Sequence, residues 1–192
     1  APGITVGVPV IAGLKRAAGM ALDVHLLVER PERFVGDFIE AGADRVAVHP
    51  ESTADFYRVV RLIRAKGAEA GAALNPATPV ETLQGVLKEV DFINILSADP
   101  GEAEGCFIPA AIEKVRAACD ARNRAAARFM VQVEGGIGSE RVRELVEAGA
   151  EILVPASSGL KHRELEKWLR EMIRQASERG GNITKTGSRR RE

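Results

Sequence analysis

Short runs of apolar, β-favouring residues alternate with amphipathic segments along most of this chain. Six such runs lie at 21–28, 45–49, 69–75, 92–98, 128–134 and 151–157. Between the runs, apolar residues recur every three or four positions, as they do on one face of a helix. This spacing predicts helices at about 31–41, 53–66, 80–89, 108–126 and 139–148, with two more at about 9–18 and 162–178.

Strands that alternate with single helices are typical of a parallel sheet covered by helices. The runs are short and apolar on both faces, which suits either a (βα) barrel or a doubly wound sheet. No Gly-x-Gly-x-x-Gly follows the first run, which weighs against a dinucleotide-binding fold. A closed barrel has eight strands and about 250 residues. Six predicted strands in 192 residues therefore indicate a barrel that is incomplete in this chain.

Several predicted helices have recognisable ends. Gly42, Gly67 and Gly149 follow the last apolar positions of three helices and are expected to stop them. Thr53 and Ser139 stand where N-cap residues belong.

Composition narrows the class of protein. Hydrophobic residues make up 45% of the chain, and 27 basic side chains balance 27 acidic ones. This indicates a globular domain with one core, and it argues against nucleic acid or an anionic membrane as the main partner. No apolar run approaches the ~20 residues of a membrane-spanning helix. Two cysteines, Cys106 and Cys119, make no disulfide framework, so a cytoplasmic location is expected.

A single barrel domain is expected over residues 1–180. Residues 181–192 are polar and end in three arginines and a glutamate. A segment of this composition cannot bury an apolar core, so it is expected to form a disordered tail.

Two strand ends carry ionisable side chains. His25 lies in the first run, and Glu134 ends the fifth, where Gly135 and Gly136 lead into the next helix. Barrel enzymes place their chemistry at the carboxyl ends of the strands. We therefore expect His25 and Glu134 to point into one cavity at the same mouth. Asp23, two positions before His25, should face the same way.

Each of these residues also has a purely structural interpretation. His25 could be a hydrogen-bonded histidine inside the end of the barrel, and Glu134 could form a salt bridge at its rim. Asp23 could be a buried, hydrogen-bonded carboxylate. His49, directly before Pro50, fits a structural role at a strand end better than a catalytic one.

Several motifs follow one another in a fixed order. They are Leu22-Asp23-Val24-His25-Leu26, Ala41-Gly42-Ala43-Asp44, His49-Pro50-Glu51, Asn75-Pro76-Ala77-Thr78-Pro79, Phe107-Ile108-Pro109 and Val133-Glu134-Gly135-Gly136-Ile137. The most distinctive run is the one that begins at Asn75. Taken together, over about residues 2–158, the ordered set resembles the ribulose-phosphate 3-epimerase family.

The resemblance implies a (βα)8 TIM barrel of the ribulose-phosphate-binding type, with a small sugar phosphate as substrate. It implies an isomerase that inverts C3 of a pentulose 5-phosphate. A proton beside the carbonyl leaves one face and returns to the other through an enediolate. It also implies one divalent metal ion per site, of the zinc, iron, manganese or cobalt class, to stabilise the enediolate oxygens.

Two residues carry over to the reaction centre by this resemblance. His25 matches a metal ligand beside the substrate. Glu134 stands where the family has an aspartate, and it is expected to be the catalytic acid–base group and a metal ligand. Its extra methylene displaces the carboxylate by about an ångström, and a misplacement of that size can lower a rate about 100-fold.

The resemblance also places the substrate phosphate beside backbone groups on the rim. The positions concerned are Gly101, Gly135, Gly136, Ala156 and Ser157. Two departures should weaken phosphate binding. The loop after Gly101 carries two glutamates, and Ala156 replaces a glycine that would allow a closer approach.

Three interpretations remain open. The first is an epimerase whose sequence here lacks the first two strands of the barrel. The second is a degenerate, weakly active or inactive barrel that serves as a binding or interaction module, in which open sheet edges could pair copies into a homo-oligomer. The third is a decarboxylase or synthase acting on another sugar phosphate, which ranks lowest because no Asp-x-Lys-x-x-Asp motif is present.

Overall fold

The structure is a computed structural model that describes residues 6–100, 105–155 and 164–177. The expectation of a disordered tail at 181–192 lies outside these residues. None of the described helices has both the length and the apolar character that crossing a membrane requires.

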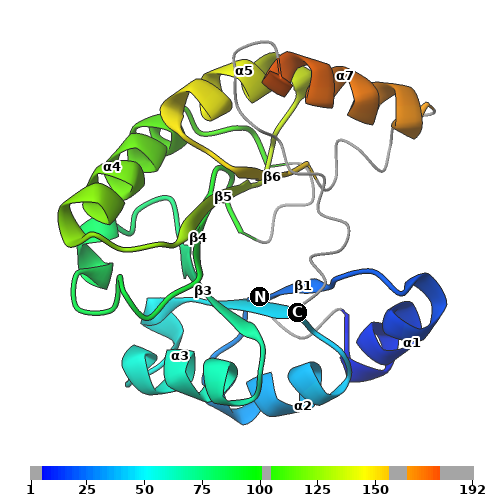
Figure 1. The fold of residues 1–192 in the computed structure, drawn as a ribbon, viewed down its shortest axis with the longest axis vertical. Coiled ribbons are helices and arrows are strands. Elements are labelled where there is room, and N and C mark those ends of the chain that lie inside the picture. Colours follow the sequence, from blue (N-terminus) through cyan, green and yellow to red (C-terminus); the bar gives the residue numbers. More distant parts are fainter. Residues whose placement is uncertain (1–5, 101–104, 156–163, 178–192) are drawn as a thin grey trace.

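The described residues form one curved sheet of parallel strands with helices on its outer side (Figure 1). The strands are β1 (Asp23–Leu26), β2 (Arg45–Val48), β3 (Glu69–Leu74), β4 (Phe92–Leu96), β5 (Met130–Glu134) and β6 (Ile152–Val154). Each strand pairs with the next along the chain, from β1 to β6. This arrangement confirms the predicted α/β fold of an incomplete barrel with six strands.

Helices connect most of the strands and cover the convex face of the sheet. The α-helices are α1 (Val8–Ala18), α2 (Val35–Glu40), α3 (Phe56–Ala65), α4 (Ala110–Ala125), α5 (Ser139–Ala148) and α7 (Leu165–Ser177). Short 3-10 helices are η1 (Pro31–Arg33), η2 (Pro50–Ser52) and η3 (Val80–Leu83).

The predicted helix over 80–89 is wrong, because only the short helix η3 forms there and turns follow it. Gly85 lies in the middle of that segment, and glycine costs about 1 kcal/mol in a helix interior. The predicted helix stops are confirmed. Gly42, Gly67 and Gly149 follow α2, α3 and α5 and adopt positive φ angles.

The predicted N-caps need correction. Helix α3 is capped by Asp55 and not by Thr53, since the Asp55 carboxylate accepts a hydrogen bond of 3.0 Å from the backbone N–H of Arg58. Helix α5 has Gly138 at its N-cap position, and Ser139 is its first residue. Both helices still begin within three residues of the predicted cap.

The outer face of the sheet carries the main hydrophobic core. Successive side chains of a strand point to opposite faces, so every second residue meets the helices. The fully buried strand residues of this core include Val46, Val48, Ile93, Ile95, Val131 and Val133. This core attaches the helices to the sheet and leaves its concave face for other side chains.

The concave face has a separate, smaller floor of apolar side chains. It consists of Ala47, Ala73 and Phe92, with Met130 packed against them. The Phe92 ring occupies space over Gly71, where an added Cβ would lie 2.3 Å from the ring. Glycine at this position therefore leaves the space that the Phe92 ring occupies.

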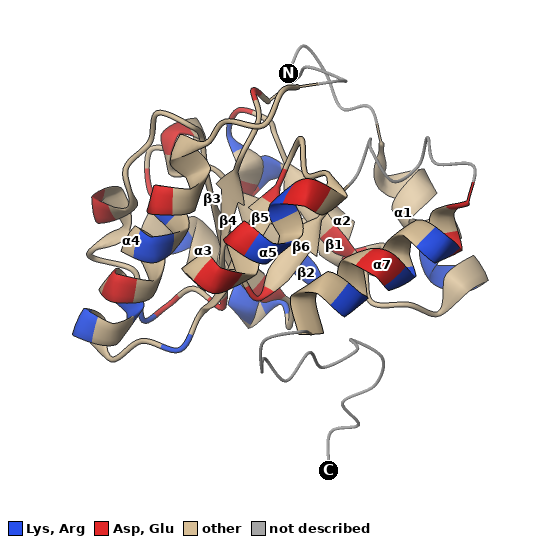
Figure 2. Cartoon of the chain, turned by 90° about the horizontal axis from the view of Figure 1, so that it is seen from above, with Lys and Arg blue, Asp and Glu red and all other residues tan. Residues whose placement is uncertain are grey.

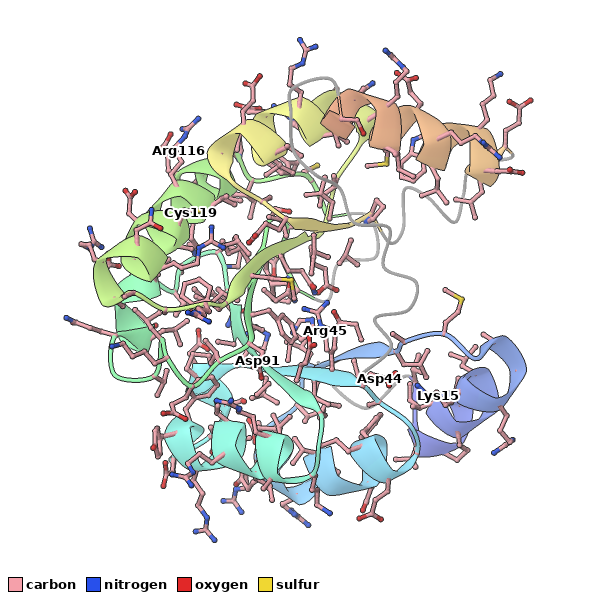
Figure 3. The ribbon with its side chains drawn as sticks, viewed as in Figure 1. Lys15, Asp44, Arg45, Asp91, Arg116 and Cys119 are labelled. Atoms are coloured by element: carbon pink, nitrogen blue, oxygen red, sulfur yellow. The ribbon has the colours of Figure 1, made fainter. Side chains whose placement is uncertain are left out.

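Arg45 covers this floor. Its guanidinium carbon lies 4.1 Å from the centre of the Phe92 ring, within cation–π range. It also pairs with Asp23 at 3.3 Å and with Glu69 at 3.0 Å. Figure 3 shows Arg45 inside the curve of the sheet, whereas Arg116 lies on the outer helix α4.

The helices at the two ends of the arc expose apolar stripes. Val10 and Leu14 of α1, and Leu165, Leu169 and Ile173 of α7, are between 39% and 48% exposed. The spacing of four residues places each set on one face of its helix. Elsewhere on the surface, acidic and basic side chains are mixed over the helices (Figure 2).

Candidate active site at the carboxyl ends of the strands

An imidazole and a carboxylate from opposite sides of the arc meet at its mouth. His25 is the third residue of β1, and Glu134 is the last residue of β5. Nδ1 of His25 lies 3.2 Å from Oε2 of Glu134. The curvature of the sheet thus brings together the two side chains that the sequence singled out. Their catalytic and metal-binding roles stay predictions.

Two residues from β4 and its following loop hold Glu134 in place. The Asn94 side-chain amide donates to Oε2 of Glu134 at 2.7 Å. The Ser97 hydroxyl donates to the backbone carbonyls of Glu134 and Gly135, at 3.1 and 2.5 Å. Both the carboxylate and the backbone that carries it are therefore fixed from the neighbouring strand.

The Glu134 carboxylate is ionised at neutral pH. Its burial opposes ionisation, but hydrogen bonds from His25 and Asn94 favour the anion, and the balance lowers the pKa of Glu134 below its usual range. Both hydrogen bonds from described side chains end on Oε2. Oε1 is therefore the oxygen that can meet a ligand.

His49 lies directly behind His25. The two Nε2 atoms are 2.8 Å apart, and His49 is only 3% exposed. Burial, followed by the charge of His25, lowers the pKa of His49 to about 4, so its ring is neutral at pH 7. Because the Glu134 carboxylate only accepts, the tautomer of His25 that satisfies this contact carries a proton on Nδ1, and His49 then donates through Nε2. The sequence identified His49 as structural, and the structure adds that it orients His25.

A second polar layer lies one step deeper along the strands. The Gln132 side chain, two residues before Glu134, hydrogen-bonds to Asp23. Burial raises the pKa of Asp23 despite the opposing effects of Arg45 and Gln132. Asp23 faces inward as expected, but its partners belong to the floor of the arc and not to the mouth.

Two of the predicted phosphate-binding residues, Gly135 and Gly136, form the turn between β5 and α5. Their φ angles are +106° and +62°. An added Cβ at Gly136 would lie 2.8 Å from the Gly105 carbonyl oxygen and 2.9 Å from the Phe107 nitrogen. The backbone of this turn thus packs closely against the segment that precedes α4.

The other predicted phosphate contacts, Gly101, Ala156 and Ser157, lie outside the described residues. The structure therefore places only the Gly135–Gly136 turn of that expected set. Its position on the same rim as His25 and Glu134 follows from β5, which carries Glu134 and ends at this turn.

Nδ1 of His25 and Oε2 of Glu134 have the spacing of two neighbouring ligand atoms of one divalent ion, which would take the place of the proton between them. With bonds of about 2.0–2.2 Å, adjacent ligand atoms lie roughly 3.0–3.5 Å apart, and the observed separation is 3.2 Å. Within the described part of the chain, however, no group of three or more His, Cys, Asp or Glu side chains gathers around one point. The described residues supply at most a partial coordination shell.

Solved structures define the class of fold. The chain resembles 3-hexulose-6-phosphate synthase from Salmonella typhimurium with a TM-score of 0.69 and 16% identity, covering 88% of this chain and 80% of the other. It resembles a mutant tryptophan synthase α-subunit from Pyrococcus furiosus with a TM-score of 0.62 and 21% identity, covering 88% and 71%. The protein is thus of the TIM-barrel class, with its ionisable side chains at the mouth.

Sequence comparison identifies the family. The model of the ribulose-phosphate 3 epimerase family matches residues 1–160, and the chain belongs to this family. It is 30% identical over 171 residues to the ribulose-phosphate 3-epimerase of Aquifex aeolicus, covering 89% of this chain and 77% of the relative. It is 39% identical over 153 residues to that of Rhodospirillum rubrum, covering 80% and 67%. By this resemblance it is an epimerase-like isomerase.

Sequence reasoning missed two residues of the site, Asn94 and Ser97. Both are fully buried polar residues in or just after β4. A signal was present, because Asn94 interrupts an otherwise apolar run, Phe92-Ile93-Asn94-Ile95-Leu96. A polar amide in such a run indicates a partner inside the fold, although the sequence does not reveal that the partner is Glu134.

Proposed function

We propose that this chain inverts C3 of a pentulose 5-phosphate by proton abstraction and return. The observation that carries the proposal is the contact of Glu134 with His25 at the carboxyl ends of β5 and β1. It is supported by the family match and by relatives named ribulose-phosphate 3-epimerases. A cytoplasmic location suits this activity, and Cys106 and Cys119 are both free.

In this proposal Glu134 is the base on one face of the substrate. Its Oε2 is held by Asn94 and His25, and Oε1 takes the proton from C3. The neutral ring of His49 keeps His25 oriented with its Nδ1 toward the carboxylate. When Glu134 takes this proton, the electrons of the C3–H bond pass into the enediolate, whose negative charge lies beside the His25 ring. A water molecule from solvent then gives C3 a proton on its opposite face, and Glu134 returns its own proton to solvent.

In this proposal, backbone groups on the rim bind the substrate phosphate and so orient the substrate. The backbone N–H groups of Gly135 and Gly136 are the donors that a phosphate would meet beside β5. Gly101, Ala156 and Ser157 complete the proposed phosphate contacts. A phosphate held there leaves the carbon chain pointing toward Glu134.

We include a divalent metal ion in the proposal, with Nδ1 of His25 and the Glu134 carboxylate as two of its ligands. The ion would replace the proton on Nδ1, and His25 would then carry its proton on Nε2 and donate it to His49. When bound, such an ion would polarise the substrate carbonyl and stabilise negative charge on the neighbouring oxygens. Among the described residues these are the two candidate ligands, and substrate oxygens and water would take further coordination positions. Activity should therefore depend on added zinc, iron, manganese or cobalt.

The decisive experiment follows ribulose 5-phosphate in D2O by NMR, with each metal and with a chelator. The proposal expects deuterium at C3 together with formation of the epimer, and loss of both in Glu134→Gln. Deuterium incorporation without inversion would mean that only the Glu134 face carries an acid–base group, which contradicts the epimerase. No incorporation with any metal would contradict the proposal entirely.

A second function, an inactive barrel that acts as an interaction module, is favoured by the apolar stripes on α1 and α7. Within the described sheet, β1 and β6 also each have only one strand partner, and free edges invite pairing between copies. Light scattering on the same sample separates the two functions. Stable assemblies without C3 exchange would support the module, whereas exchange by a monomer would exclude it.

A further inference from the structure

Asn94 is an unusual residue for its position. All five residues of β4 are buried, and Asn94, which is 0% exposed, is the polar one among them. A buried amide is unfavourable unless it is hydrogen-bonded, and leucine would fill a similar volume without that penalty. The Asn94 Oδ1 atom has no hydrogen-bond partner among the described residues. Stability alone therefore does not account for an amide here.

The single described hydrogen bond of the Asn94 side chain goes to the proposed base. Its Nδ2 donates to Oε2 of Glu134 at 2.7 Å, and Nδ1 of His25 lies 3.2 Å from the same oxygen. The last torsion of a glutamate is otherwise broad. Two donors on one oxygen fix this torsion and determine where Oε1 points.

The register of the sheet explains the direction in which Asn94 acts. Glu134 pairs with Leu96 of β4, and Asn94 lies two residues earlier on the same face of that strand. The amide therefore draws the carboxylate back along the strand, toward the interior of the arc. A glutamate is long enough to reach it, whereas an aspartate at position 134 would be one methylene shorter.

We propose that Asn94 is a positioning residue that makes a glutamate at position 134 competent for proton transfer. This inference rests on the proposed function and adds a residue to it. Asn94 does not touch the reacting carbon. It acts by holding Oε2, so that Oε1 lies where the C3 proton is.

The kinetic test is a double-mutant cycle between Asn94→Leu and Glu134→Asp. With Glu134 present, Asn94→Leu should lower kcat about 10- to 100-fold, as expected for a misplaced catalytic group, and change KM less than about threefold. With Glu134→Asp, the same change should alter kcat less than about twofold, because the shorter carboxylate does not reach the amide. Equal losses in both backgrounds would overturn the proposal.

Gln132→Leu is the matched control. Gln132 pairs in register with Asn94, is 2% exposed and carries an amide that contacts Asp23 instead of Glu134. Its replacement should leave kcat within about twofold of the parent. A loss equal to that of Asn94→Leu would mean that any change in this layer damages the site, and the specific role of Asn94 would be excluded.

Crystal structures of the parent and of Asn94→Leu test the same role without turnover. The proposal expects the distance from Glu134 Oε2 to His25 Nδ1 to lengthen beyond hydrogen-bond range, about 3.5 Å. An unchanged contact would overturn the positioning role. If the parent shows no C3 exchange, the proposed function fails, and this structural comparison alone decides whether Asn94 positions Glu134.

Discussion

At the scale of single residues, the buried His49 links protonation to folding. Its pKa is about 4 in the folded chain, against an ordinary value of 6.5. Below pH 6.5 the imidazole of His49 binds a proton in the unfolded chain but stays neutral in the folded chain until the pH approaches 4. The neutral ring therefore contributes stability above pH 6.5, and this contribution is lost as the pH falls toward 4. A difference of about 2.5 pKa units corresponds to roughly 3 kcal/mol.

We expect His49→Gln to reduce this pH dependence, because glutamine is neutral at every pH and its amide can stand in for the Nε2–H donor. The free energy of unfolding is measured with denaturant at pH 7.5 and 4.5, in the presence of a chelator. The parent should lose about 2–3 kcal/mol more than the variant between the two pH values. His25, Glu51 and Glu134 face His49 and also titrate, so the difference between the two proteins is the relevant quantity. Equal losses would contradict a neutral, buried His49.

The meeting of His25 and Glu134 was predictable from the sequence, since both lie near the carboxyl ends of apolar strands. Their hydrogen-bond partners were not predictable. Asn94 lies 40 positions from Glu134, and His49 lies 24 positions from His25. Such contacts depend on the register and curvature of the sheet, which local periodicity does not specify.

At the scale of elements, the contact between β3 and β4 depends on a residue without a side chain. Gly71 lies beneath the Phe92 ring, and the ring lies beneath the Arg45 guanidinium. A methyl group at position 71 would have to displace a ring that is fully buried. Because interiors are close-packed, such displacement is costly.

Gly71→Ala is therefore expected to lower the free energy of unfolding by about 1–3 kcal/mol through overpacking. Gly13→Ala is the matched control, since Gly13 lies inside α1 with no atom within 4 Å of an added Cβ. That change should raise stability by up to about 1 kcal/mol through helix propensity. Denaturant titration of both variants checks the pair. A neutral Gly71→Ala would show that the ring is not confined.

Most elements were predictable because their signals are local. The strand and helix alternation follows from periodicity, and Gly42, Gly67 and Gly149 stop helices through their own backbone conformation. The errors arose where local signals compete. At 80–89 the apolar spacing favoured a helix while Gly85 opposed it, and at α3 both Thr53 and Asp55 are residues that favour N-caps.

At the scale of the whole molecule, apolar surface gathers at the two ends of the arc. The stripes on α1 and α7 contain most of the exposed large hydrophobic residues in the described part of the chain. Contiguous patches of this kind mark interaction surfaces or aggregation sites. Within the described part of the chain, these helices flank β1 and β6, which each pair with one strand, so association is expected there.

We expect the double substitution Leu14→Lys and Leu169→Lys to reduce concentration-dependent self-association measured by light scattering. The free energy of unfolding should change by less than about 1 kcal/mol, because surface changes usually have small effects. Tyr57→Lys is the control, since Tyr57 is also 42% exposed but lies on α3, away from both ends. Association unaffected by the double change, or equally reduced by Tyr57→Lys, would show that the stripes do not drive it.

The strand β1 has four residues, lies at the margin of the described sheet and carries His25. A marginal strand is the part of a sheet that detaches at the smallest free-energy cost. Each time β1 detaches, His25 would leave the site while Glu134 of β5 stays in place. A ligand that contacts both His25 and Glu134 would therefore hold β1 in the sheet. Its binding should slow amide hydrogen exchange in β1 more than in the central strands.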